Sequence, residues 1–249
     1  MKPPRRKTVR RVLAPLALAA GAVLSIAATG KPTRSLETPS TNWNGTMAVT
    51  ANGSHRFGNP DAPVTLVEYV SYTCPHCAHY QQEADPVLRL TVVPKGQVSV
   101  TVTNLLRNPI DLTLAMLTNC GDPKRFFVRH NAFFATQEKW LGKAGKMTPG
   151  QLQRWNQGNL ITRMRAIAGD LGFYDTMSGW GIDRAQADAC LADKGMLDKL
   201  KAQQEESVTL GINSTPSFTL NGEVLQVHDW ASVSKAITDK LAEEHAGAV

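Results

Sequence analysis

The segment from Val64 to Cys77 constrains this chain more than any other, because it combines a buried strand, a turn and a helix start. Its first half, Val64–Val70, is rich in β-branched and aromatic residues and follows the turn-forming residues 58–63, Gly-Asn-Pro-Asp-Ala-Pro, a pattern typical of a strand. Its second half places Cys74 at the expected N-cap of a helix and Pro75 at the first helical position, where proline's missing N–H costs nothing. The segment therefore predicts a strand that runs into a helix through a cysteine-bearing turn.

The two cysteines of this turn are expected to be chemically reactive. Cys74 and Cys77 are separated only by Pro75 and His76. A helix N-terminus presents unpaired N–H groups and the positive end of the helix dipole, so it stabilises a thiolate at Cys74, and the thiolate is the reactive form of cysteine. Because Cys77 lies one turn further inside the helix, we expect Cys74 to be the more exposed, attacked sulfur and Cys77 its buried partner.

A zinc half-site is the alternative for this spacing, because Cys-x-x-Cys also occurs in metal sites. His76 and His79 are near in sequence, but the chain has neither a second Cys-x-x-Cys nor a His-x₃-His pair. No nucleotide, flavin or metal motif is visible. We therefore expect no metal site and no separate cofactor, and the redox group is predicted to be the Cys74–Cys77 disulfide itself.

The pattern after the cysteines indicates an α/β fold. Helical spacing continues from Cys77 to Pro94–Gly96, with Pro86 expected to kink or interrupt the helix. Gln97–Leu105 alternates and is expected to be a strand. The resulting β-α-β order places the cysteines at the first strand-to-helix junction, where open α/β sheets bind ligands.

The two ends of this fold carry weaker patterns. Thr46–Thr50 predicts a short edge strand, and His55 and Arg56 are interpreted as solvated residues of the loop after it. Near the C-terminus, Ser217–Val227 contains Asn-Gly between two short runs and predicts a hairpin. An amphipathic helix over residues 229–245 closes the fold.

Strand patterns largely disappear between residues 110 and 210, where helical spacing dominates. Aromatic and histidine side chains recur there at helical spacing, namely Phe126, Phe127, His130, Phe133 and Phe134. Such a stripe is mostly a packing face, and lining of a substrate groove is the weaker interpretation. We therefore expect an all-helical insertion within the α/β frame.

Three features together resemble a known family: the Cys-Pro-His-Cys tetrapeptide, the acidic Glu68 six residues before its first cysteine, and Thr215-Pro216 ahead of a late strand. With the approach at residues 58–63, they resemble the DsbA-like thiol:disulfide oxidoreductases of the thioredoxin superfamily. The resemblance extends over about residues 46–245. The match is specific at the motifs and loose in the middle of the chain. It implies a thioredoxin-like α/β fold with a central mixed sheet and an inserted all-helical domain.

The N-terminal residues read as an export signal. Residues 1–11 carry six basic side chains and no acid, and residues 12–28 are an apolar run of Ala, Leu, Val and Ile, as in a secretory signal peptide. An uncleaved membrane anchor is the alternative. Because a signal peptide directs export, we expect the protein to be periplasmic. The predicted organisation is a signal peptide at 1–28, a flexible tether at 29–45, a thioredoxin-like domain formed by 46–109 and 211–249, and a helical insertion domain at 110–210.

The leader also accounts for the positive charge of the chain. The formal net charge is +6, from 27 basic and 21 acidic residues. Without the six basic residues of the leader, 21 of each sign are left, so the mature protein is expected to be near neutral. The basic character therefore gives no reason to expect a nucleic-acid partner.

The remaining cysteines, Cys120 and Cys190, both fall in the helical insertion. In an exported protein an even pair favours a structural disulfide, which would stabilise the fold by about 4 kcal/mol in the chain-entropy model. Two buried free thiols are the alternative. The resemblance permits a second bridge without requiring it.

The resemblance assigns further roles around the active pair. Thr215-Pro216 would be the cis-proline loop, which faces the cysteines and holds substrate backbone by strand-like hydrogen bonds. His76 is expected to donate a hydrogen bond or positive charge to the Cys74 thiolate. Glu68 is expected to be buried beneath the pair and to relay a proton to or from Cys77, the alternative being an ordinary strand glutamate with its carboxylate in solvent.

The favoured function is a monomeric dithiol oxidase that introduces disulfides into unfolded or reduced secreted proteins and is re-oxidised by a DsbB-type membrane partner. Isomerase or reductase activity is kept as an alternative, because Thr215 stands where oxidase members often have valine. The isomerases dimerise through an added N-terminal domain, for which the chain before the fold is too short. A periplasmic peptide-binding or holdase module with incidental redox activity is the hypothesis from another class.

Overall fold

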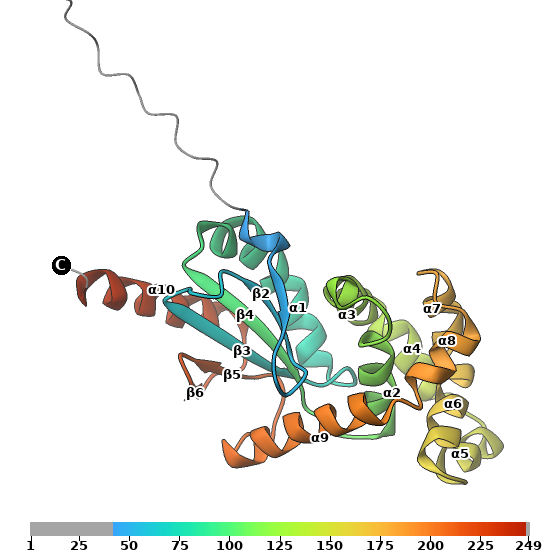
Figure 1. Ribbon diagram of the computed structural model, residues 1–249. Helices are drawn as coiled ribbons and strands as arrows, with labels where there is room; N and C mark the ends of the chain where they lie inside the picture. Colours follow the sequence, from blue (N-terminus) through green and yellow to red (C-terminus); the bar gives the residue numbers. More distant parts are fainter. Residues whose placement is uncertain (1–41, 248–249) are drawn as a thin grey trace, which may run out of the picture. The chain divides into compact units, whose positions relative to one another are not determined.

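The computed structural model describes residues 42–247, which contain a six-stranded sheet in the order β1-β2-β4-β3-β5-β6. Its central strand β3 is parallel to β4 and antiparallel to β5, so the sheet is mixed, as expected for a thioredoxin-like fold (Figure 1). The strands are β1 (Met47–Val49), β2 (His55–Gly58), β3 (Val64–Val70), β4 (Val98–Asn104), β5 (Ser217–Leu220) and β6 (Glu223–Leu225).

Helix α1 (Pro75–Val87) makes the crossover that two parallel strands require. The predicted disturbance at Pro86 is present, because the α-helix ends one residue later and continues as a π turn (Leu88–Val92) and a 3-10 turn (Val93–Lys95). The segment stops at Gly96, whose φ of +73° suits glycine. Helix α10 (Trp230–Gly247) packs against α1, β3 and β5.

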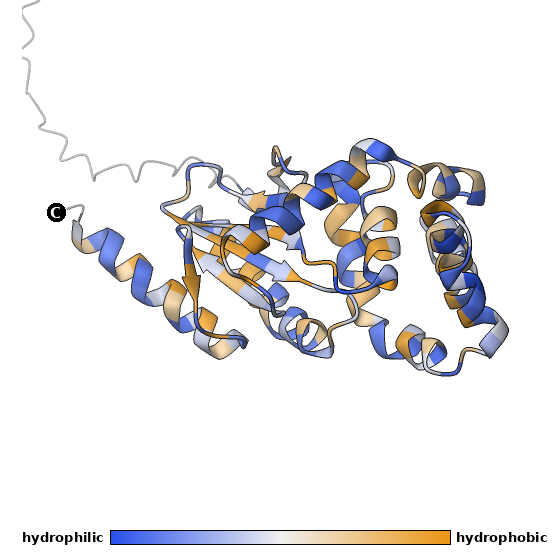
Figure 2. Ribbon diagram, turned by 90° about the horizontal axis from the view of Figure 1, so that it is seen from below, coloured by the Kyte–Doolittle hydropathy of each residue, from blue (hydrophilic) through white to orange (hydrophobic). Residues whose placement is uncertain are grey.

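Between β4 and β5 the described chain contains helices only, as predicted. They are α2 (Pro109–Thr118), α3 (Phe126–Ala135), α4 (Gln137–Ala144), α5 (Pro149–Asn156), α6 (Leu160–Leu171), α7 (Phe173–Ser178), α8 (Arg184–Cys190) and α9 (Lys194–Thr209), with a 3-10 helix (Pro123–Arg125) before α3. One hydrophobic core runs from the sheet into these helices. Figure 2 shows apolar and polar residues interspersed along them, the pattern of helices with one apolar face. The insertion is thus joined to the sheet by packing as well as by the chain.

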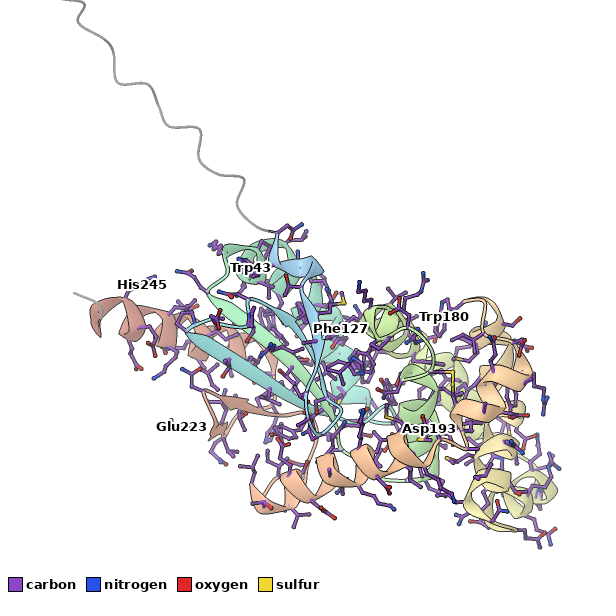
Figure 3. All side chains as sticks on the ribbon, in the orientation of Figure 1. Trp43, Phe127, Trp180, Asp193, Glu223 and His245 are labelled. Carbon is purple, nitrogen blue, oxygen red and sulfur yellow. A yellow bond between two sulfur atoms is a disulfide. The ribbon has the colours of Figure 1, made fainter. Side chains whose placement is uncertain are left out.

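The aromatic stripe on α3 is part of this core. Its five members, Phe126, Phe127, His130, Phe133 and Phe134, are all 3% exposed or less. Phe127 packs edge-on against Phe57 of β2 at a centroid distance of 4.8 Å; Figure 3 shows Phe127 at the junction of the sheet and the helices. The interpretation as a packing face is confirmed.

The prediction of a solvated loop at His55 and Arg56 was wrong. Both lie in β2, which pairs with β1 and β4, and His55 is only 4% exposed. Its ring stacks on Phe126 at 3.7 Å, and burial lowers its pKa to about 4. A four-residue strand with two polar residues resembles a loop in sequence, and only α3 reveals that it is covered.

The expected tether ends earlier than predicted. Trp43–Gly45 form a 3-10 helix, and Asn44 Nδ2 donates to the carbonyl oxygen of Arg89 at 2.6 Å. The predicted signal peptide and most of the tether lie outside the described residues. Within residues 42–247, no helix is long and apolar enough to cross a membrane.

Candidate active site

The two cysteines lie where β3 gives way to α1. Cys74 is the N-cap residue of α1, with extended φ and ψ of −88° and 116°, and Pro75 is its first helical residue. The backbone N–H of Cys77 donates to the Cys74 carbonyl at 3.1 Å, which closes the first turn. Both side chains are free thiols in this structure. The local sequence rule for helix starts thus predicts the position of both sulfurs correctly.

Hydrogen bonds to sulfur make Cys74 acidic. The pKa of its thiol is lowered to about 5, first by a hydrogen bond from the Cys77 side chain and further by Thr215 and the backbone N–H groups of Cys77 and His76. These donors outweigh the effect of burial, which acts in the opposite direction. Cys74 therefore carries a thiolate at neutral pH when the pair is reduced.

Cys77 has the opposite character. Burial raises the pKa of its thiol well above the ordinary value, and the adjacent Cys74 adds to this. Cys74 is 2% exposed and Cys77 0%, so Cys74 is the more exposed of the two, as expected, but only slightly. The asymmetry of the pair comes mainly from hydrogen bonding to the Cys74 thiolate.

His76 contributes through its backbone. Its side chain is exposed, and no hydrogen bond from its imidazole to Cys74 occurs among the described residues. Its backbone N–H, which faces the Cys74 sulfur, lowers the pKa of that thiol. Any residue except proline supplies the same N–H at this position, so the geometry does not support the imidazole role expected from the sequence.

The Thr215-Pro216 loop lies over the cysteines because of the strand register. Tyr69 of β3 is opposite Ser217 of β5, so the residues before Ser217 project beyond the end of β3 at which Cys74 lies. The Thr215–Pro216 peptide bond is cis. Cys74 Sγ lies 3.2 Å from the Thr215 carbonyl oxygen, to which it donates in its thiol form, and His228 Nδ1 is 2.7 Å from the Pro216 carbonyl oxygen.

Glu68 is buried in the centre of the sheet, 2% exposed. Burial raises the pKa of its carboxyl to about 7, although the Tyr80 hydroxyl donates to its Oε1 at 2.9 Å and acts in the opposite direction. Tyr80 lies on α1 one turn after Cys77, and the pKa of its phenol is raised first by burial, then by Glu68, and last by the charge of Cys77. The structure thus brings together Glu68, Tyr80 and Cys77, and it excludes a solvent-exposed Glu68.

Two side chains of the insertion hold the cysteine turn, and the sequence analysis missed both. Asp111 of α2 accepts from the Thr73 backbone N–H at 2.8 Å and from the Ser71 hydroxyl at 2.9 Å. Gln137 of α4 donates from Nε2 to the carbonyl oxygens of Tyr72 and Cys74, at 2.7 and 2.8 Å. Asp111 follows Asn-Pro and could have been recognised as a helix-start acid, but no sequence feature identifies the partners of either residue.

The second cysteine pair forms a disulfide. Cys120 follows α2 and Cys190 ends α8, with Cα atoms 5.5 Å apart and a sequence separation of 70 (Figure 3). In the described part of the chain, no group of three or more His, Cys, Asp or Glu side chains could hold a metal ion.

Comparisons with known proteins agree with this geometry. The model of the thioredoxin family matches residues 50–239. A Rickettsia typhi protein assigned by name as a protein-disulfide oxidoreductase is 27% identical over 195 residues, 78% of this chain and 64% of that protein. The chain therefore spans less than two thirds of the length of this curated relative.

Solved structures are also similar. A crystal structure described as protein-disulfide isomerase from Novosphingobium aromaticivorans is 43% identical, with a TM-score of 0.74, covering 77% of this chain and 99% of that one. Wolbachia pipientis alpha-DsbA1 is 18% identical with a TM-score of 0.62, over 81% of this chain and 97% of the other. The latter likeness concerns the fold alone.

Proposed function

We propose a function for this chain, which belongs to the thioredoxin family and is DsbA-like. It is a thiol:disulfide oxidoreductase that introduces disulfides into exported proteins. The observation that carries the proposal is the Cys74 thiol, whose pKa of about 5 reflects strong stabilisation of the thiolate. A stabilised thiolate favours the reduced pair, so the Cys74–Cys77 disulfide is a strong electron acceptor.

The reaction transfers two electrons from a substrate dithiol to the protein. A substrate thiolate attacks Cys74 Sγ of the disulfide, which forms a mixed disulfide and releases Cys77 sulfur. The second substrate thiolate then attacks the substrate sulfur of that mixed disulfide, and the Cys74 thiolate leaves. The substrate gains a disulfide, the protein is left as a Cys74 thiolate and a Cys77 thiol, and the other substrate proton passes to solvent.

Glu68 is proposed to supply the proton that Cys77 takes up. The high pKa of the Cys77 thiol means that its sulfur leaves well only if it is protonated as the bond breaks. A carboxyl with a pKa of about 7 is partly protonated at neutral pH and so can both give and recover a proton. Tyr80, hydrogen-bonded to Glu68, orients the carboxyl.

The substrates are proposed to be unfolded or reduced secreted proteins, held at the Thr215-Pro216 loop by strand-like hydrogen bonds. Residues 1–28 would direct a monomeric protein to the periplasm, and a DsbB-type membrane protein would re-oxidise Cys74 and Cys77 there. No further cofactor is required, because the cysteine pair itself carries the electrons.

Disulfide isomerase activity is the second candidate, because the 43%-identical structure is described as a protein-disulfide isomerase. Thr215 before the cis-proline is in keeping with either activity. A peptide-binding or holdase module is distinguished by Cys74→Ser, since a binder keeps its function with this substitution and an oxidoreductase loses it.

The deciding experiment is the equilibrium of the Cys74–Cys77 pair with glutathione, measured in Cys120→Ser/Cys190→Ser protein so that a single pair titrates. A potential near about −120 mV is expected for a disulfide donor. A value near about −270 mV, as in thioredoxin, would overturn the oxidase proposal. Refolding of a scrambled substrate then separates isomerase from oxidase activity.

A further inference from the structure

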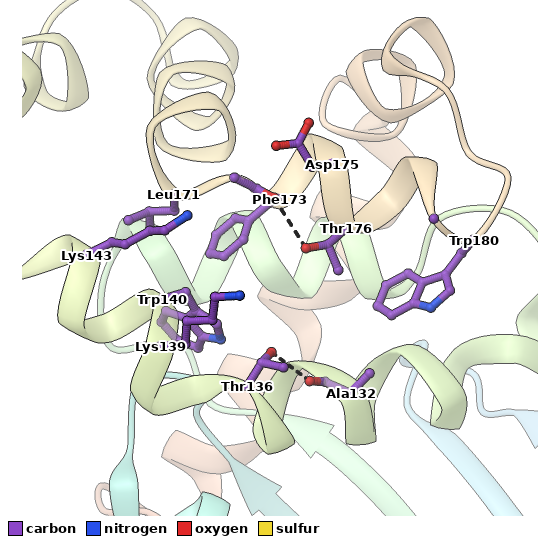
Figure 4. Close-up of a pocket in the computed structure, with 12 residues that line it drawn as sticks. Ala132, Thr136, Lys139, Trp140, Lys143, Leu171, Phe173, Asp175, Thr176 and Trp180 are labelled. Atoms are coloured by element: carbon purple, nitrogen blue, oxygen red, sulfur yellow. Dashed lines mark hydrogen bonds between the residues drawn. The ribbon is translucent and has the colours of Figure 1, made fainter.

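A second site is formed by the insertion, outside the cysteine centre. A pocket of about 410 Å³ lies among α3, α4, α7 and the end of α6. Its walls include Trp140, Phe173 and Trp180, and two lysines, Lys139 and Lys143, line the same pocket. Figure 4 shows Lys143 and Trp180 at opposite ends of this pocket. None of these residues has a part in the proposed redox chemistry.

The aromatic walls are held by packing. Phe173 contacts Phe133 and Trp140 edge-on, each at a centroid distance of 5.6 Å, and Phe133 contacts Trp180 at 5.4 Å. The indole N–H of Trp140 donates to the Phe133 carbonyl oxygen at 3.0 Å. The indole N–H of Trp180, which is partly exposed, has no hydrogen-bond partner among residues 42–247. Trp140 and Phe173 are 4% and 1% exposed and form the floor of the pocket, whereas the partly exposed Trp180 presents its ring and this indole N–H.

The lysine end of the pocket is positively charged. Lys139 and Lys143 lie one turn apart on α4, both exposed, and neither forms an ion pair within the described part of the chain. A Cβ added at Gly172 would be 3.2 Å from Lys143 Nζ, so this ammonium lies directly over the bend between α6 and α7. Asp175 is the one acid that lines the pocket, so the lysines leave an excess of positive charge.

We propose that this pocket binds an aromatic side chain flanked by carboxylates on a polypeptide substrate. Sites of this size, with mostly apolar walls and a few polar groups, suit ligands of side-chain dimensions. The aromatic ring packs against Trp180 above the floor formed by Trp140 and Phe173, and the carboxylates face Lys139 and Lys143. The proposal rests on the proposed function, because it adds a substrate contact outside the cysteine centre.

Helix α4 connects this pocket to the cysteine turn. Its first residue, Gln137, binds the carbonyls of Tyr72 and Cys74, and Lys143 follows six residues later, about 9 Å along the helix. Leu141 and Gly142 of the same helix line a second pocket together with Pro75. The second pocket takes Gln137, Glu138, Leu141 and Gly142 from α4, whereas the first takes Lys139, Trp140 and Lys143, so the two pockets lie on different faces of this helix. A substrate bound at Cys74 therefore has to pass over α4 to reach the lysines.

The test uses a cysteine-free peptide, dansyl-Gly-Glu-Phe-Asp-Gly-amide, and fluorescence anisotropy with the full-length protein. Two comparison peptides replace the acids by Gln and Asn, or the Phe by Ala. We expect both comparison peptides to bind at least fivefold more weakly. Lys139→Gln/Lys143→Gln should weaken binding of the acidic peptide five- to tenfold, and raised salt should weaken it as well.

The matched control is Lys124→Gln/Lys146→Gln, which removes the same charge at exposed lysines that do not line the pocket. It should change binding less than twofold. Equal binding of the acidic and amide peptides, or equal losses in both double variants, would overturn the proposal. The peptide has no thiol, so binding is independent of redox chemistry. Binding without glutathione exchange would disprove the proposed function alone, and exchange without binding would disprove the pocket alone.

Discussion

The two cysteine pairs of this protein occupy opposite ends of helices. Cys74 caps the N-terminus of α1, whereas Cys120 follows the last turn of α2 and Cys190 is the last residue of α8. The N-terminal end of a helix stabilises a thiolate and the C-terminal end destabilises it. The carbonyl oxygen of Gln186 lies 3.9 Å from Cys120 Sγ, so this sulfur also faces an acceptor.

Burial does not explain the difference between the pairs. Cys190 is more exposed than Cys74, yet Cys190 is the bridged residue. What differs is the stability of the thiolate that reduction would create. A disulfide whose reduction forms a stable thiolate is easily reduced, whereas one whose reduction forms no stable thiolate resists reduction. The two pairs can therefore serve exchange and structure within one hydrophobic core.

The largest expected effect comes from removal of the bridged pair. Cys120→Ser/Cys190→Ser should lower the free energy of unfolding by about 4 kcal/mol, because the closed loop is long. The pKa of Cys74 should stay at about 5, since none of its causes involves the bridge. Denaturant unfolding and thiolate absorbance at 240 nm measure the two quantities. A loss below about 1 kcal/mol would contradict the stabilising role of the bridge. A changed Cys74 pKa would mean that the two pairs are coupled.

The second prediction compares two carboxyl groups, Glu68 near the Cys74–Cys77 pair and Asp188 near the Cys120–Cys190 pair. The raised pKa of Glu68 means that the folded protein resists its ionisation, so stability is lost as pH rises from about 4.5 to about 7. Glu68→Gln keeps an acceptor for Tyr80 without this loss. It should therefore equal the wild type at pH 4 and exceed it at pH 8 by on the order of 3 kcal/mol.

Asp188, two residues before Cys190, is the matched control for Glu68. It is partly exposed and pairs with Arg165 at 3.3 Å. Asp188→Asn removes a partnered charge and should not gain stability at pH 8. Unfolding of both variants at pH 4 and pH 8 makes the comparison. A Glu68→Gln difference that is independent of pH would show that this carboxyl is not held neutral.

A smaller effect is expected from the amide that holds the redox turn. Gln137→Ala removes both hydrogen bonds to the carbonyls of Tyr72 and Cys74. The Cys74 carbonyl keeps the N–H of Cys77, but the Tyr72 carbonyl is left buried without this donor, so stability should fall by about 2 kcal/mol. Gln186→Ala, near the bridge, removes only an exposed capping contact with Asp183 and should lower it by less than about 1 kcal/mol. Equal losses would mean that the insertion does not hold the redox turn.

The parts that the sequence predicts well are those set by local rules. The position of Cys74 at a helix N-cap follows from Pro75 and the preceding strand, and the burial of the α3 aromatics follows from their spacing. The strand Val64–Val70 and the hairpin at Asn221, whose φ is +50°, follow from β-propensity and turn chemistry.

The parts that the sequence does not predict depend on contacts between distant residues. Gln137 is 63 residues from Cys74, and Asp111 is 38 residues from Thr73. A buried glutamine and a surface glutamine have the same sequence pattern, so their partners emerge only from the packed insertion. His55 was misread for the same reason, because the α3 ring that covers it is distant in sequence.

The smallest expected effect concerns Thr215, whose hydroxyl and carbonyl both lie near the redox pair. The prediction tests whether the hydroxyl stabilises the Cys74 thiolate. Thr215 Oγ1 is buried without a hydrogen-bond acceptor in the described chain, and its side chain lowers the pKa of Cys74. A buried donor without a partner is unfavourable, and a Cys74 thiolate would give this donor an acceptor. Thr215→Val removes the donor and keeps the shape. The Cys74 pKa should therefore rise from about 5, by less than about one pH unit.

Absorbance at 240 nm against pH measures this change, with Thr219→Val as the control, since Thr219 is a buried threonine further along β5. The control should leave the Cys74 pKa unchanged. If Thr215→Val also leaves it unchanged, the thiolate depends on Cys77 and the helix N–H groups alone. The contrast between the two cysteine pairs would then reduce to which end of a helix each sulfur occupies.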